Sequence, residues 1–101
     1  MGRAQRAEVL VDQWGPVEPA LAAVLLGTAL RATHPVERIA LVCDWAASPS
    51  VVRRRALARA LTDPFPCAGA ITALDVLSRD PDPAVRGAAR QAIQIRSQLH
   101  G

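Results

Sequence analysis

Residues 80–93 read DPDPAVRGAARQAI, and the other helices of the chain can be located from this stretch. The carboxylates of Asp80 and Asp82 can accept hydrogen bonds from the N–H groups that lack partners at the start of a helix. Pro81 and Pro83 fix the backbone φ angle, and Pro83 suits the first helical turn, where its missing N–H donor costs nothing. The stretch therefore predicts a tight turn followed by a helix.

Apolar residues flank this turn on both sides at helical spacing. After the turn they follow the spacing i, i+4, i+7 and i+8 on one helix face, at Val85, Ala89, Ala92 and Ile93. Before the turn a second stripe is formed by Ile71, Leu74 and Leu77. Two amphipathic helices joined by a short turn are expected to pack as an antiparallel hairpin.

Copies of this pattern occur earlier in the chain. Residues 48–61 read SPSVVRRRALARAL, and Pro49 precedes Pro81 by 32 residues. A second step of the same length reaches the turn at residues 15–19, which lacks the Val-Arg pair but has an apolar helical pattern on each side. A period of this length indicates an array of stacked units, for which about three copies are needed for stability.

A helix, a D-P-x-(x)-V-R-x-x-A turn and a second helix resemble a HEAT-like repeat, in the compact bacterial form named after phycobilisome-lyase proteins. The resemblance covers nearly the whole chain and is strongest in its last third. It implies an all-α fold, an α-solenoid of three antiparallel helical hairpins with about six helices. We expect a single domain over residues 1–101, with units at 1–32, 33–64 and 65–101.

The helices expected from these patterns are residues 2–13, 20–32, 35–47, 48–62, 67–79 and 83–99. Thr33 is the expected N-terminal cap of the third helix, with Pro35 in its first turn. Half of the residues are hydrophobic and only 3% are aromatic, so the core must consist mainly of Ala, Leu, Val and Ile. Such a core suits closely packed helices, because Ala has the highest intrinsic helix propensity.

The sequence argues against secretion, membrane insertion and catalysis. No signal peptide is recognisable, and the longest uncharged run, residues 19–30, is shorter than the roughly 20 residues that span a bilayer. We therefore expect a cytoplasmic protein without a membrane partner. The chain contains none of the common nucleophile, phosphate-loop or metalloprotease motifs, so no enzymatic activity and no cofactor are expected.

The two cysteines and two histidines do not form a metal-binding pattern. Cys43 and Cys67 are expected to be buried free thiols, with a disulfide as the disfavoured alternative in a cytosolic chain. His34 and His100 do not supply further ligands at the close spacing that a zinc site requires. No metal site is expected.

Two arginines recur in register with the repeat. Arg53 matches Arg86 once one inserted residue is allowed for. In HEAT-like repeats this arginine commonly joins a ladder of Asp and Arg side chains along the turns. The resemblance therefore implies a structural role for both arginines, with Asp80 or Asp82 as their partners.

Three other arginines have no counterpart in the third unit, where the matching residues are Gly87, Ala88 and Ala92. They are Arg54, Arg55 and Arg59. Arg55 and Arg59 are separated by one helical turn and share a face. We expect a positively charged docking surface for an acidic partner or a phosphate; the alternative is an ordinary solvated helix face.

The second predicted helix, ALAAVLLGTAL, is apolar nearly all round and must be covered on more than one side. The cover is either the rest of the array or a second protein, including another copy of the chain. Leu21, Leu25 and Leu26 are the candidate apolar contacts for such a partner.

These features predict a non-catalytic protein–protein interaction module or adaptor that displays a rigid helical surface. The first alternative is a nucleic-acid-binding protein that uses its arginine-rich face. The second, implied by the resemblance alone, is a helper or lyase-like factor for a cofactor-bearing protein.

Overall fold

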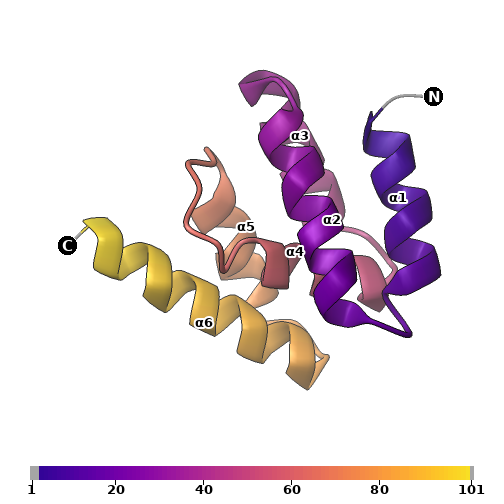
Figure 1. Cartoon of the computed structure of the whole chain (residues 1–101). Coiled ribbons are helices and arrows are strands. Elements are labelled where there is room, and N and C mark those ends of the chain that lie inside the picture. Colours follow the sequence, from indigo (N-terminus) through magenta and orange to yellow (C-terminus); the bar gives the residue numbers. More distant parts are fainter. Residues whose placement is uncertain (1–2, 101) are drawn as a thin grey trace.

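The computed structural model describes residues 3–100, and within these residues it contains six α-helices and no strand. The helices are α1 (Arg3–Trp14), α2 (Pro19–Ala32), α3 (Pro35–Ala46), α4 (Val51–Ala60), α5 (Ala70–Leu77) and α6 (Pro83–His100) (Figure 1). The predicted all-α fold with six helices is confirmed. Gly2, the predicted first residue of the first helix, lies outside the described residues.

The short helix α4 lies at the centre of the packing. It contacts α2 on one side and α6 on the other, and it also touches α1, α3 and α5. Within successive pairs, α1 packs on α2, α3 on α4 and α5 on α6, and α3 also contacts α5 (Figure 1). These contacts fit stacked hairpins, and the superhelical arrangement of a solenoid stays a prediction.

Three prolines mark equivalent turns of the chain. Pro16 lies between α1 and α2, Pro49 between α3 and α4, and Pro81 between α5 and α6, all outside the helices. The repeat assigned these positions to turns, and this prediction is confirmed. A proline is tolerated there because no intrahelical hydrogen bond has to be donated by its nitrogen.

The core is aliphatic, as the composition required. Its largest fully buried side chains are Leu26, Leu30, Leu57, Leu61, Leu74, Leu77, Val11, Val42 and Val85. The alanines at positions 89 and 92 are also fully buried, so the predicted stripe of α6 faces inward. Trp45 and Phe65 add the aromatic part of the core.

The start of α6 is capped as expected. A carboxylate oxygen of Asp82 accepts a hydrogen bond from the N–H of Val85 at 3.0 Å. The carboxylate of Asp80 accepts one from the N–H of Asp82 at 2.9 Å. Both aspartates therefore satisfy backbone donors in the turn before α6, as their position in the sequence predicted.

Three other helix starts differ from the prediction. The fourth helix begins at Val51 rather than at residue 48, with Ser50 as its cap. Thr33 does not cap α3, because its hydroxyl donates to the carbonyl of Ala29 at 2.6 Å and closes α2 instead. His34 is the cap, and its Nδ1 accepts from the N–H of Val36. The fifth helix begins at Ala70 rather than at residue 67, directly after Gly69, whose φ of 83° is not helical.

Gly15 and Gly87 offer a paired test of this packing. A Cβ atom on Gly15 would lie 2.6 Å from the carbonyl oxygen of Val11 and would also overlap Val52, whereas one on Gly87 would meet nothing within 4 Å. We expect Gly15→Ala to lower the free energy of unfolding by about 1–3 kcal/mol. Gly87→Ala, within α6, is expected to raise it by about 0.5–1 kcal/mol. Urea denaturation measures both changes; effects of the same sign would contradict the packing around Gly15.

None of the helices in the described part of the chain combines the length and the apolar character needed to cross a membrane.

Candidate functional site

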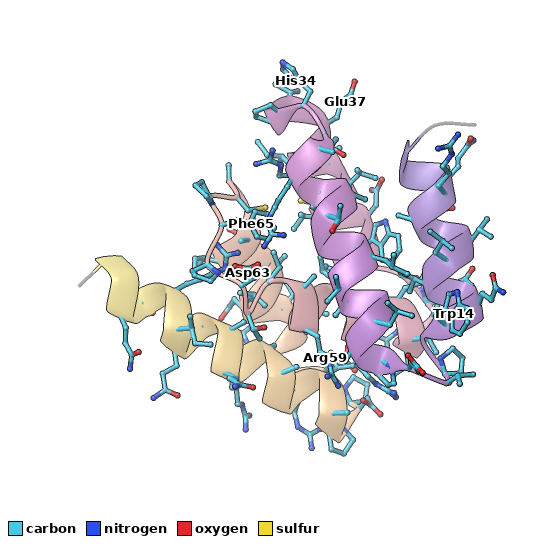
Figure 2. The ribbon with its side chains drawn as sticks, in the orientation of Figure 1. Trp14, His34, Glu37, Arg59, Asp63 and Phe65 are labelled. Atoms are coloured by element: carbon cyan, nitrogen blue, oxygen red, sulfur yellow. The ribbon has the colours of Figure 1, made fainter. Side chains whose placement is uncertain are left out.

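A groove with a volume of about 630 Å³ lies between α2 and α6, and α4 forms its floor. We call it the α2–α6 groove. Its walls carry small side chains, namely Ala20, Ala23 and Gly27 of α2 and Ala84 and Ala88 of α6. Its floor carries Arg55 and Arg59. Figure 2 shows Arg59 in the space between the ribbons of α2 and α6.

The groove exists because most residues on its two walls are small. Only the Cβ of Ala60, at 3.9 Å, would come within 4 Å of a Cβ added to Gly27. The large apolar side chains Leu26 and Leu30 of α2 are buried in the core and do not enter the groove, whereas Val24 lines it. The α2–α6 groove therefore results from the small size of the alanine and glycine residues at these positions.

Arg55 and Arg59, two of the three arginines without a counterpart in the third unit, are brought together by the structure. Both line the groove, and neither side chain has an ion pair or hydrogen bond within the described part of the chain. Arg59 is exposed and Arg55 is half-buried. The Nε of Arg55 is buried and has no acceptor. Buried donors normally find a partner, so this N–H is left for an acceptor from outside the described chain, such as a water or a ligand.

An ion pair lines part of the groove. Arg31 of α2 pairs with Asp63, which follows α4, and its guanidinium also lies 4.9 Å from the centre of the Phe65 ring. Figure 2 places Asp63 and Phe65 beside one another near the loop that leads to α5. Three arginines and one aspartate thus line the groove, which leaves an excess of two positive charges.

The structure separates Arg54 from the predicted docking stripe. Its Nε donates to a carboxylate oxygen of Asp80 at 2.6 Å, and Nη1 donates to the carbonyl of Ser48 at 2.8 Å. The two side chains are only 17% and 6% exposed. Successive residues of a helix are about 100° apart around its axis, so Arg54 faces the turn before α6 while Arg55 faces the groove. Arg54 is therefore removed from the candidate docking surface.

Asp80 is ionised in this pair. Burial alone would raise the pKa of its carboxyl group. The hydrogen bonds from Arg54 and from the N–H of Asp82, together with the charges of Arg54 and Arg86, outweigh burial and hold the pKa of Asp80 below its usual value. The pair is thus a buried ion pair that joins α4 to the α5–α6 turn.

Both arginines that recur in register make structural contacts, but only Arg86 contacts one of the predicted partners, Asp80. Arg53 does not reach Asp80 or Asp82. It donates to both carboxylate oxygens of Asp12 in α1, at 2.9 and 2.7 Å. The Arg53 hydrogen bond lowers the pKa of the Asp12 carboxyl group despite partial burial. Arg86 donates to the main-chain carbonyl of Asp80 at 2.9 Å and not to a carboxylate.

Arg96 is a structural residue that the sequence analysis missed. It is 6% exposed, and its guanidinium donates to three main-chain carbonyls. These belong to Leu61, Phe65 and Asp63, at 2.9, 3.0 and 3.0 Å. The sequence did indicate that residue 96 is buried, because it continues the spacing of the apolar stripe at residues 85, 89 and 92. An arginine on an apolar stripe must find acceptors inside the fold.

Arg38 was missed as well. From α3 it donates to the carbonyls of Leu30, Pro66, Arg31 and Thr33. Arg38 thus binds the end of α2, and Arg38 and Arg96 together hold the segment between α4 and α5. No local pattern around residue 38 indicated this, since its acceptors lie in other elements.

The leucines proposed as partner contacts lie in different environments. Leu26 is 2% exposed and belongs to the core, so it cannot contact a partner. Leu21 and Leu25 are half-buried. The large apolar residue that α2 exposes is Val24, at 64%, and it lines the groove. The all-round apolar character of α2 is thus explained mostly by its contacts with α1 and α4.

The cysteines are both free, and the structure corrects the expectation that both are buried. Cys43 is exposed, whereas Cys67 is half-buried. Burial raises the pKa of the Cys67 thiol, although the charges of Arg96 and Arg38 oppose this shift. Among the described residues, no three His, Cys, Asp or Glu side chains gather where they could hold a metal ion.

Comparisons of the chain with protein-family models, with curated proteins and with solved structures found no match. The resemblance to HEAT-like repeats therefore rests on the turn motif and its period.

Proposed function

We propose that the protein is a non-catalytic interaction module that binds an acidic protein partner in the α2–α6 groove. The observation that supports this most directly is the pair of arginines on the groove floor. Arg55 and Arg59 have no counter-ion in the described chain, although other arginines of the same region, such as Arg54 and Arg31, have one. A partner that carries carboxylates would complete the site.

The elements around the groove are held in place before a partner arrives. The Arg54–Asp80 pair fixes α4 against the turn that begins α6. The Arg31–Asp63 pair and the carbonyl contacts of Arg96 fix the end of α4 against α2 and α6. Binding then requires little ordering of the scaffold, which favours affinity.

A protein partner fits the surface better than a nucleic acid. Proteins that bind single strands usually stack bases on exposed aromatic rings. The chain has only three aromatic residues. Trp45 and Phe65 are buried and Trp14 is half-buried, so no exposed stacking platform is available. The excess charge in the groove is also small for a phosphate backbone, along which one charge follows another every few ångströms.

The test compares two double variants of equal charge change. We expect Arg55→Ala with Arg59→Ala to reduce the recovery of protein partners in affinity purification from the native host by at least about tenfold, because both charged contacts are lost. The matched control is Arg79→Ala with Arg90→Ala, which removes two exposed arginines that do not line the groove. Mass spectrometry quantifies the partners, and circular dichroism verifies the fold. Full recovery by the groove variant would reject the proposal.

A further inference from the structure

The α2–α6 groove contains an acid that belongs to the chain itself. Asp63 follows α4, and among the described residues that line the groove it is the only carboxylate. We call the three arginines that line the groove with it, Arg31, Arg55 and Arg59, the groove arginines. Asp63 pairs with Arg31, which leaves the other two without an acid. A carboxylate at this position opposes an acidic partner in two ways, since it occupies one arginine and repels negative charge.

The Arg31–Asp63 pair is open to exchange with another acid. Both of its side chains are exposed, in contrast to the buried Arg54–Asp80 pair. Exposed ion pairs contribute little to stability, because the separated charges are well solvated and pairing restricts two flexible side chains. A carboxylate from a partner can therefore replace Asp63 at Arg31 with little loss of folding stability.

Arg31 and the segment that carries Asp63 have other contacts, which do not depend on the Asp63 carboxylate. The guanidinium of Arg31 lies 4.9 Å from the centre of the Phe65 ring, a cation–π contact. The main-chain carbonyl of Asp63 accepts a hydrogen bond from Arg96 at 3.0 Å. Release of the Asp63 side chain therefore leaves Arg31 at the groove and the segment after α4 in place.

We propose that Asp63 is an internal competitor of the acidic partner: its carboxylate binds Arg31 in the free protein, and a carboxylate of the bound partner takes its place. Asp63 thereby lowers the affinity of the groove for acidic segments and favours those with enough negative charge to bind Arg31 as well. The inference rests on the proposed function. It adds Arg31 to the binding site and identifies Asp63 as the residue that limits affinity.

An NMR titration of the ¹⁵N-labelled full chain with tetraglutamate, blocked at both ends, tests this at low salt, where charges are least screened. Asp63→Asn leaves Arg31 without its partner and should bind the peptide about three- to tenfold more tightly than the wild type. The Nε–H signals of the groove arginines should shift. The matched control is Asp75→Asn, which frees Arg79 from an exposed ion pair outside the groove and should change the affinity by less than about twofold.

A second pair of variants distinguishes competition for Arg31 from the charge of Asp63 alone. In the Arg31→Gln background, Asp63→Asn should tighten binding by only about twofold, the effect of one unit charge about 10 Å away in water. An equal gain with and without Arg31 would overturn the inference, because Asp63 would then act only by its charge. Circular dichroism verifies that every variant is folded.

The remaining outcomes distinguish the inference from the proposed function. Shifts confined to the groove, with equal affinities for the wild type and Asp63→Asn, would overturn the inference and leave the proposed function standing. A gain of the same size in Asp75→Asn would have the same meaning. No shift of the groove arginines in any variant would also overturn the inference, and the affinity purification above then decides the proposed function by itself.

Discussion

Replacing Arg54 by Ala is expected to lower the free energy of unfolding by about 3–5 kcal/mol, because it leaves the buried carboxylate of Asp80 without its partner. The variant also removes the hydrogen bond to the carbonyl of Ser48. In a domain of this size, a loss of 3 kcal/mol corresponds to a fall in Tm of about 12 °C or more. Urea denaturation and thermal melting followed by circular dichroism measure the two quantities.

The variant Arg55→Ala is the control for Arg54→Ala. Arg55→Ala removes the same charge from the same helix, but its side chain lines the groove without an ion-pair partner, and we expect a change within about 1 kcal/mol. The double variant Arg54→Ala with Asp80→Asn should lose less than the sum of the two single variants, because the unpaired buried charge is then removed. Equal losses for Arg54→Ala and Arg55→Ala would contradict the assignment of opposite roles.

The same ion pair predicts a dependence on pH. The pKa of Asp80 is lowered in the folded state, so the unfolded chain binds more protons than the folded chain below about pH 4–5. The stabilisation by Asp80 is therefore fully present above its unfolded pKa and is lost as the pH falls through its folded pKa. The wild type should lose stability over this acid range more steeply than the Arg54→Ala variant, in which the pKa of Asp80 is no longer held down by the pair.

Arg96→Gln is expected to have the second large effect, a loss of about 3–5 kcal/mol. Hydrogen bonds from a charged donor typically contribute about 1.5–3 kcal/mol each, and the three that Arg96 makes do not add fully. The shorter glutamine cannot reach carbonyls of residues 61, 63 and 65 together. Burial lowers the pKa of Arg96, and no carboxylate lies among its hydrogen-bond partners, so the carbonyls are what satisfies its charge.

The rate at which Cys67 is labelled distinguishes a local effect of Arg96→Gln from a general loss of stability. Cys67 follows the segment that Arg96 holds and is half-buried, whereas Cys43 is exposed and serves as an internal reference. We expect a thiol reagent to label Cys67 faster in the Arg96→Gln variant when the assay is run at a pH at which both thiols are largely ionised, so that the loss of the Arg96 charge, which lowers the pKa of Cys67, does not mask the greater access, with little change at Cys43.

Arg90→Ala, an exposed arginine on the same helix, is the matched control and should change stability by no more than about 0.5 kcal/mol. Arg96→Lys keeps the charge without the planar fork and should recover only part of the loss. An unchanged Cys67 labelling rate in Arg96→Gln would contradict the role assigned to Arg96.

Much of the fold could be predicted from neighbouring residues alone. The period of apolar residues located the six helices, and prolines at equivalent positions located the turns between the helices of each pair. The caps at Asp80 and Asp82 were predictable because a cap and the N–H that it binds are only two or three residues apart. The candidate site was also partly predictable. The matching positions of the third unit are not arginine, so Arg55 and Arg59 could be identified as residues that the repeat does not require.

What only the tertiary structure decided is the partner of each arginine. Arg53, Arg54 and Arg55 are consecutive and chemically identical, yet one binds Asp12, one binds Asp80 and one faces the groove. The acids lie 41 and 26 residues away along the chain, on other elements. A rotation of about 100° per residue sends each side chain to a different neighbour, and only helix packing determines which neighbour lies there. Local spacing thus determined the helices and turns, while the pairing of charges and the open groove depended on the packing of α2, α4 and α6.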